Sequence, residues 1–317
     1  MIQVFSQRTD KPKMDSFMRP SELGVGGRNY LSFNPIEFSI SPDGVNWHSC
    51  YDDPDLQDVY CYQAPDVQPA NQTDSLKKIG LVDGQRLLSS SYDTRTITMR
   101  IICRQSPNEV SAMLGYDALQ RFLVSREPYW ICFENWPQRM YYVKAKMGAP
   151  TFTSDRSWTC EVTLTDLIGL SRSIATSIDY QNNNGFGNNM PIDQLSYSFT
   201  SNSFTINNLS DTIIDPERRN HPLKITLQGS SSGNMKITNK TTGNSINRIG
   251  VNVGGKMTNS AFNGTWILDG VRATLNGNSD QMQCDTGVIT LQPGSNDFQI
   301  DNFSGKVTFD FPFWWLS

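Results

Sequence analysis

Apolar and polar side chains alternate along several stretches in the first half of the chain. Residues 95–101 alternate, with Cys103 continuing the apolar positions, and residues 141–147 and 158–164 repeat the pattern. Tyr129–Phe133 is a short apolar run. A period of two residues is typical of an antiparallel strand with one buried face. We therefore expect strands at these four places.

A helical pattern interrupts these strands. Ser106, Pro107 and Glu109 match a capping box, in which the Ser106 hydroxyl accepts from the amide of Glu109 and the Glu109 carboxylate reaches back. The apolar positions that follow have spacings of three and four residues: Val110, Met113, Leu114, Ala118 and Phe122. This spacing is typical of one apolar helix face. The sequence thus predicts one convincing helix, ending near Val124.

Residues 41–75 carry dense turn signals. Ser41-Pro42-Asp43-Gly44, Asp53-Pro54 and Ala64-Pro65-Asp66 lie within this stretch. Pro, Asp and Gly at such density are typical of loops. We expect an irregular surface excursion anchored by Trp47.

The composition changes between residues 176 and 197, where an Asn- and Gly-rich run (181–189) offers little to bury. We interpret 176–197 as a linker between a domain of residues 1–175 and a domain of residues 198–317. Short apolar stretches recur after it, separated by turn residues: Phe204–Ile206, Leu223–Leu227, Met235–Thr238, Trp266–Leu268, Val288–Leu291, Phe298–Ile300 and Val307–Phe311. Many short strands at such spacing indicate a β-sandwich or barrel. The fold class is mainly β.

The amino-acid composition disfavours several classes of function. A formal net charge of -4 provides no basic surface for sequence-specific nucleic-acid binding. No apolar run reaches about 18 residues, so we expect no membrane insertion. The six cysteines form no C-x-x-C pair and there are only two histidines, which disfavours a metal site. We interpret the cysteines as reduced core residues, with a Cys50–Cys61 bridge as the open alternative.

Candidates for catalysis are weak. His48 lies beside Asp52 and Asp53, but no nucleophile motif accompanies it. Paired carboxylates of the glycosidase type have no specific signal here. Gly24–Gly27 lacks the Lys and Ser or Thr of a phosphate-binding loop and is interpreted as a turn. We expect no catalytic residue, no cofactor and no enzymatic activity.

Several segments together resemble a known family. They are Asp83–Leu88, Thr96–Arg104, Leu119–Phe122, Arg126–Trp130 and Trp158–Leu164 in the first half, then Phe204–Asn208, Ile237–Gly243, Ile289–Phe298 and Phe309–Trp315. In this order they resemble the distal tail proteins of long-tailed, non-contractile bacteriophages. The resemblance covers about residues 80–175 and 200–317.

The resemblance implies a structural virion protein at the tail tip, assembled in the bacterial cytoplasm. It implies a homo-hexameric ring built by an N-terminal β-sandwich-like domain with one helix, and a C-terminal β-sandwich like galectins and carbohydrate modules that points outward. One ring face would bind the tail-tube protein and the other a tail-associated lysin or fibre protein. DNA would pass through the ring.

Two sets of contact residues follow as expectations. We expect a hairpin of Leu81–Tyr92 to cross the subunit boundary, with Arg86, Leu87 and Leu88 as ring-interface candidates. The alternative function is a host cell-wall carbohydrate-binding module, in which Trp266 and Trp314 contact glycan. Receptor-binding proteins or host glycan are thus further partners to consider. The apolar neighbours of both tryptophans favour packing over sugar binding.

Overall fold

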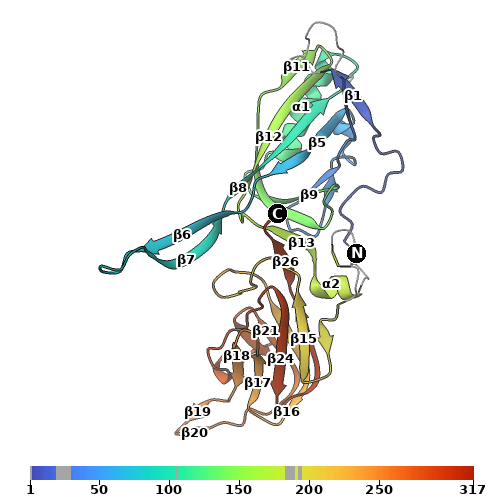
Figure 1. The fold of residues 1–317 in the computed structure, drawn as a ribbon. Helices are drawn as coiled ribbons and strands as arrows, with labels where there is room; N and C mark the ends of the chain where they lie inside the picture. Colours follow the sequence, from blue (N-terminus) through green and yellow to red (C-terminus); the bar gives the residue numbers. More distant parts are fainter. Residues whose placement is uncertain (1, 19–29, 105, 183–189, 192–194) are drawn as a thin grey trace. The chain divides into compact units, whose positions relative to one another are not determined.

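The structure is a computed structural model that describes residues 2–18, 30–104, 106–182, 190–191 and 195–317 (Figure 1). The chain divides into two compact units. The N-terminal unit comprises Ile2–Ile174 with Leu316–Ser317, and the C-terminal unit comprises Ala175–Trp315. The expected Gly24–Gly27 turn and residues 183–189 and 192–194 of the expected linker lie outside the described residues.

Strands form most of the N-terminal unit. They are β1 (Asp15–Met18), β2 (Tyr30–Phe33), β3 (Phe38–Ser41), β4 (His48–Ser49), β5 (Val59–Val67), β6 (Asn71–Lys77), β7 (Arg86–Asp93), β8 (Arg95–Cys103), β9 (Tyr129–Phe133), β10 (Arg139–Met147), β11 (Thr151–Ser154), β12 (Ser157–Asp166) and β13 (Ser171–Thr176). A 3-10 helix, η2 (Pro54–Leu56), and an α-helix, α1 (Glu109–Leu123), complete it. The four expected strands, three from alternation and one from an apolar run, correspond to β8, β10, β12 and β9.

One antiparallel sheet organises the N-terminal unit. Its strands follow the order β4-β3-β9-β10-β12-β8-β5, with β11 on β12 and β13 on β10. The β8–β12 ladder is regular from Trp158 opposite Cys103 to Asp166 opposite Arg95. Alternate residues of a strand point to the same side of the sheet, so the apolar residues of β8 and β12 share one face. This face is buried.

Helix α1 packs on this sheet, and its buried residues are Ala112, Gly115, Ala118, Leu119, Phe122 and Leu123. The expected apolar face is only partly right: Ala118 and Phe122 are buried, whereas Val110, Met113 and Leu114 are exposed. The cap is not the expected one. The Asn108 side chain accepts from the amide of Ser111 at 2.9 Å, whereas the Ser106 hydroxyl lies 3.2 Å from the Cys103 sulfur. Asn is as good an N-cap as Ser, and the helix begins two residues later than a Ser106 cap would place it.

Trp158 fixes α1 to the sheet. Its Nε1–H donates to the carbonyl oxygen of Ala112 at 2.7 Å, and its ring meets that of Tyr116 edge to face. Trp158 is fully buried. We expect Trp158→Phe to lower the free energy of unfolding by about 1–3 kcal/mol, because the buried carbonyl loses a donor and the core loses volume. Urea unfolding measures this, and an unchanged midpoint would contradict it.

The segment 41–75 corrects one expectation. Residues 41–67 are not a surface excursion, because β5 is a strand of the main sheet and Cys50, Leu56, Val59 and Cys61 are core residues. Residues 71–75, at the start of β6, are exposed. Trp47 is only partly buried. The turn signals mark the connection between β3 and β4 and the start of η2, whereas Ala64-Pro65-Asp66 lies within β5.

The C-terminal unit is a β-sandwich. Its strands are β14 (Ser198–Phe199), β15 (Ser203–Asn208), β16 (Lys224–Ser231), β17 (Met235–Asn239), β18 (Ser245–Arg248), β19 (Asn252–Val253), β20 (Lys256–Met257), β21 (Phe262–Asp269), β22 (Arg272–Leu275), β23 (Asn278–Ser279), β24 (Gly294–Asp301), β25 (Ser304–Asp310) and β26 (Pro312–Trp315). One sheet has the order β14-β25-β16-β21-β22-β23 and the other β15-β24-β17-β18. Phe298 and Phe309, one from each sheet, meet with ring centroids 4.8 Å apart.

Two expectations about this unit need correction. Val288–Leu291 is not a strand, since its only pairing is a single bridge between Leu291 and Ile214. The expected linker contains a short helix, α2 (Ser177–Asn182), whose Tyr180 is buried. The 3-10 helix η3 (Gln281–Gln283) was not expected either.

His221 makes the free energy of unfolding of the C-terminal unit depend on pH. Its Nδ1–H donates to the carbonyl oxygen of Ile213 at 2.9 Å, and its ring stacks on Trp314. Burial lowers the pKa of His221 below 6.5. The unfolded chain therefore binds a proton that the folded chain does not, and the free energy of unfolding falls as the pH drops below about 6.5.

We expect this slope to reach at most about 1.4 kcal/mol per pH unit and to disappear in His221→Gln. Unfolding by urea between pH 7 and pH 5 measures it. His48→Gln is the matched control, because His48 is more than half exposed. A slope that survives in His221→Gln but not in His48→Gln would contradict the assignment.

Candidate assembly surface

A two-stranded arm, residues 71–93, projects from the N-terminal unit (Figure 1). It consists of β6 and β7, which pair antiparallel up to Lys77 opposite Arg86. Residues 78–85 join the strands, and Gly80 and Gly84 adopt positive φ angles there. Among the described strands, none pairs with the outer edge of β6 or β7.

The base of the arm is fixed to the sheet. Arg95 follows the arm directly, and its Nε–H donates to Asp166 at 2.9 Å with both side chains buried. Gly169 has a φ of 72°, and a Cβ at this position would lie 1.9 Å from the carbonyl oxygen of Asp93. Only glycine permits this close approach. The arm is therefore held at its base while its far end has no support from its own unit.

The far end of the arm is apolar and exposed. Leu81 is fully exposed, and the other exposed apolar side chains are Leu76, Ile79, Val82, Leu87 and Leu88. Leu76 lies opposite Leu87 in the ladder, so apolar side chains of the two strands meet. An isolated two-stranded hairpin is at best marginally stable in water. These features are typical of a surface that another molecule covers.

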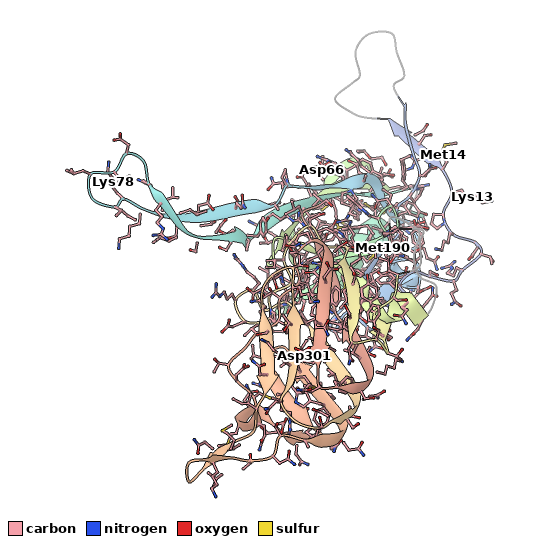
Figure 2. All side chains as sticks on the ribbon, turned by 60° about the horizontal axis from the view of Figure 1, so that its bottom comes forward. Lys13, Met14, Asp66, Lys78, Met190 and Asp301 are labelled. Carbon is pink, nitrogen blue, oxygen red and sulfur yellow. The ribbon has the colours of Figure 1, made fainter. Side chains whose placement is uncertain are left out.

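The same end is basic. It carries Lys77, Lys78 and Arg86 against the single carboxylate of Asp83. In the part of the chain that the structure describes, no ion pair includes any of the three cations. Figure 2 places Lys78 at the far end of the arm. A partner that covers the apolar residues would thus gain by offering carboxylates nearby.

The hairpin is larger than the sequence indicated. The expected hairpin of Leu81–Tyr92 contains the tip and the second strand, whereas the first strand begins at Asn71. The ring-interface candidates Arg86, Leu87 and Leu88 all lie at the start of β7 and are exposed. Sequence reasoning missed Leu76, Ile79 and Val82. Their only signal is an apolar cluster inside an otherwise polar stretch.

The two glycan candidates are packed inside the C-terminal unit. Trp266 is fully buried, and its Nε1–H donates to Asp280 at 3.0 Å. Trp314 is 4% exposed and stacks on His221 with ring centroids 4.9 Å apart. Neither tryptophan presents a ring face on which a sugar could stack.

The residues weighed for chemistry lie as follows. His48 lies 3.8 Å from Asp53, and its ring contacts Phe122. Cys50 and Cys61 are unbridged and buried, and burial raises the pKa of the Cys61 thiol to about 12. Within the described ranges, no group of three or more His, Cys, Asp or Glu side chains is placed to hold a metal ion. The helices of the described residues include none that is long and apolar enough to cross a membrane.

Comparison with known proteins relates the chain to phage tails. Residues 56–165 match the model of the phage tail protein RIFT-related domain, a range that includes the whole arm. No curated protein matches the chain. The resemblance to phage tail proteins drawn from the sequence is thus confirmed for this part of the N-terminal unit.

Solved structures are similar in fold. The crystal structure of the phage SPP1 Dit protein, described as a paradigm of the hub adsorption apparatus in phages that infect Gram-positive bacteria, matches with a TM-score of 0.51 and 16% identity. The match covers 87% of this chain and 99% of that one. A chain of the phage P2 baseplate in its activated conformation with Ca matches with a TM-score of 0.38 and 10% identity, over 88% of this chain and 97% of that one. The SPP1 match confirms a mainly β fold, similar to that of the SPP1 Dit protein.

Proposed function

We propose that this chain is a structural distal tail protein of a non-contractile phage. Six copies form a ring that joins the tail tube to the adsorption apparatus at the tail tip. The observation that carries the proposal is the projecting arm, whose exposed apolar end needs a partner, within a segment that matches a phage tail domain. The arm of one copy contacts a different surface on the next copy, so each contact is heterologous. Heterologous contacts generate a ring when the rotation closes.

The two units have different roles. The N-terminal unit carries the arm and forms the ring, and the C-terminal β-sandwich attaches further proteins. The partners are the tail-tube protein on one face and a tail-associated lysin or fibre protein on the other. DNA passes through the opening, in accord with a formal net charge of -4 that disfavours binding to phosphates. This function includes no catalytic step.

Labelling of virions tests the location. Gold-conjugated antibodies against the C-terminal unit are expected to bind only at the tail end far from the capsid. Label spread along the tube or on the capsid would contradict the proposal. An antibody against the tail-tube protein serves as the control for access to the tail.

Glycan binding has no observation in its favour, since Trp266 and Trp314 are both buried. We do not propose it as a second function.

A further inference from the structure

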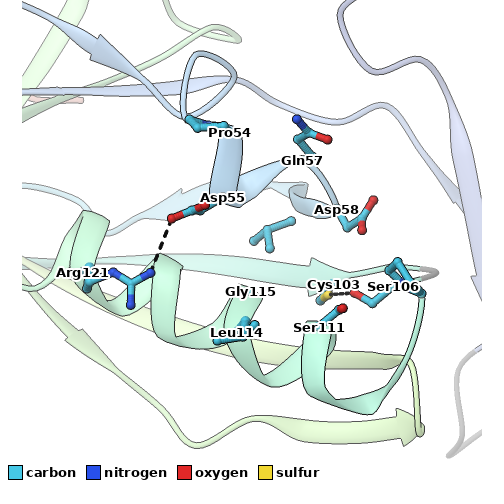
Figure 3. Close-up of a pocket in the computed structure, with 12 residues that line it drawn as sticks. Pro54, Asp55, Gln57, Asp58, Cys103, Ser106, Ser111, Leu114, Gly115 and Arg121 are labelled. Atoms are coloured by element: carbon cyan, nitrogen blue, oxygen red, sulfur yellow. Dashed lines mark hydrogen bonds and ion pairs between the residues drawn. The ribbon is translucent and has the colours of Figure 1, made fainter.

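A second exposed apolar surface lies on α1. Val110, Met113 and Leu114 recur at spacings of three and four on the face that points away from the sheet, and all three are exposed. Beside them, between η2 and α1, lies a pocket of about 290 Å³ (Figure 3). We call the three residues and the pocket together the α1 groove.

Gly115 and Val59 lie in the lining of the pocket, where α1 approaches β5 closely. A Cβ at Gly115 would lie 3.3 Å from a methyl carbon of Val59, so a larger residue would press on the strand. Leu114 forms one wall and η2 forms the other. The groove thus offers an apolar wall at the surface and a cavity large enough for an aliphatic side chain.

The groove is also acidic. Asp55, Asp58 and one cation, Arg121, line the pocket, and Glu109 begins α1 beside Val110, so carboxylates outnumber cations. Asp55 pairs with Arg121 at 3.5 Å. Among the described residues, no ion pair includes Asp58, whose carboxylate is partly buried, and burial raises its pKa. A cation brought to this carboxylate would offset the cost of its burial.

We propose that the α1 groove accepts the tip of the arm from a second copy of this chain. This inference rests on the proposed ring and names the contact that builds it. The apolar tip residues Leu81 and Val82 would cover the apolar stripe of α1. Lys77, Lys78 and Arg86 would approach Asp58 and Glu109, so the two surfaces are complementary in both polarity and charge.

Geometry favours a neighbouring copy over the arm's own groove. Seven residues of β6 span about 23 Å at about 3.3 Å per residue. Figures 1 and 2 show that the arm extends away from the unit that carries α1. The far end can therefore contact another copy while its own groove stays free. Repeated from copy to copy, this contact produces a head-to-tail ring.

Disulfide trapping in the full-length chain tests the contact. We combine Leu81→Cys on the arm with Leu114→Cys in the groove, in a Cys284→Ser background, because the other five cysteines are buried. Mild oxidation is expected to give a ladder of covalent multimers on a non-reducing gel, up to six copies. Each single variant is expected to give dimers at most.

The matched control pairs Leu81→Cys with Val124→Cys at the other end of α1, about 15 Å away along the helix axis at 1.5 Å per residue. Val124 is also exposed. An equal ladder from the control, or rings of six copies that yield no ladder from the Leu114 pair, would overturn the inference while the proposed ring stands. A chain that stays monomeric at all concentrations would overturn both.

A second variant tests the groove without cross-linking. Leu114→Asp places a charge on the exposed apolar stripe and is expected to weaken self-association at least about 10-fold, with unchanged circular dichroism. Val124→Asp is expected to leave self-association unchanged. Full assembly of Leu114→Asp would overturn the inference and would show that the arm contacts a surface other than the α1 groove.

Discussion

A chain in which residues 71–93 are replaced by Asn-Gly is expected to fold but to remain monomeric. The arm strands make no ladder with the rest of the sheet. Asn71 lies opposite Asp93 at the base, so a two-residue turn can close the gap between β5 and β8. Each apolar side chain that a partner buries fully contributes about 1.5–3 kcal/mol. Loss of all six should therefore weaken association by at least about 100-fold.

Analytical ultracentrifugation over a range of concentrations measures this effect. The matched control is the double variant Val253→Ser and Met257→Ser, which keeps the arm and the chain length. It removes exposed apolar residues from the β19–β20 hairpin of the C-terminal unit. We expect normal assembly from this control. Rings formed by the armless chain would show that the arm serves another contact, such as the one with the tail tube.

Arg248→Met is expected to have the largest effect on stability. Arg248 and Asp280 are both buried, and the Nε–H of Arg248 donates to Asp280 at 2.6 Å. Trp266 donates to the same carboxylate, and Arg248 also donates to the main chain of Ser260. Removal of the cation leaves a buried carboxylate without its charge partner, which costs about 3–5 kcal/mol.

This is a large fraction of the 5–15 kcal/mol that usually stabilises a domain, so thermal unfolding of the C-terminal unit should shift strongly downward. Differential scanning calorimetry measures the shift. Arg272→Met on β22 is the matched control, because Arg272 is exposed. Equal shifts for the two variants would contradict the role assigned to the buried pair.

The local pattern of apolar and polar residues was sufficient to predict the elements that are half-buried. Residues 95–103 and 158–164 alternate because one face of β8 and β12 lies in the core and the other does not. The spacing of apolar residues likewise predicted that α1 exists, but not which residues it buries, because Val110, Met113 and Leu114 are exposed and the cap is Asn108 rather than Ser106. The resemblance to phage tail proteins was drawn from short segments, and the family match confirms it over residues 56–165.

Edge strands and long-range contacts could not be predicted from the sequence. β5 contains Pro65 and two register shifts, and an edge strand tolerates both because one side of its backbone needs no ladder partner. The arm has no buried face, so its strands show no alternation. The α1 groove joins residues 54–59 to residues 103–121, and no local pattern reports that they meet.

The mass of the purified full-length chain tests the central claim most directly. Light scattering coupled to size-exclusion chromatography is expected to give six times the 35.7 kDa of one chain. Negative-stain images of the same fraction should show rings with an open centre. A monomer at every concentration tested, or an oligomer without an opening, would contradict the account.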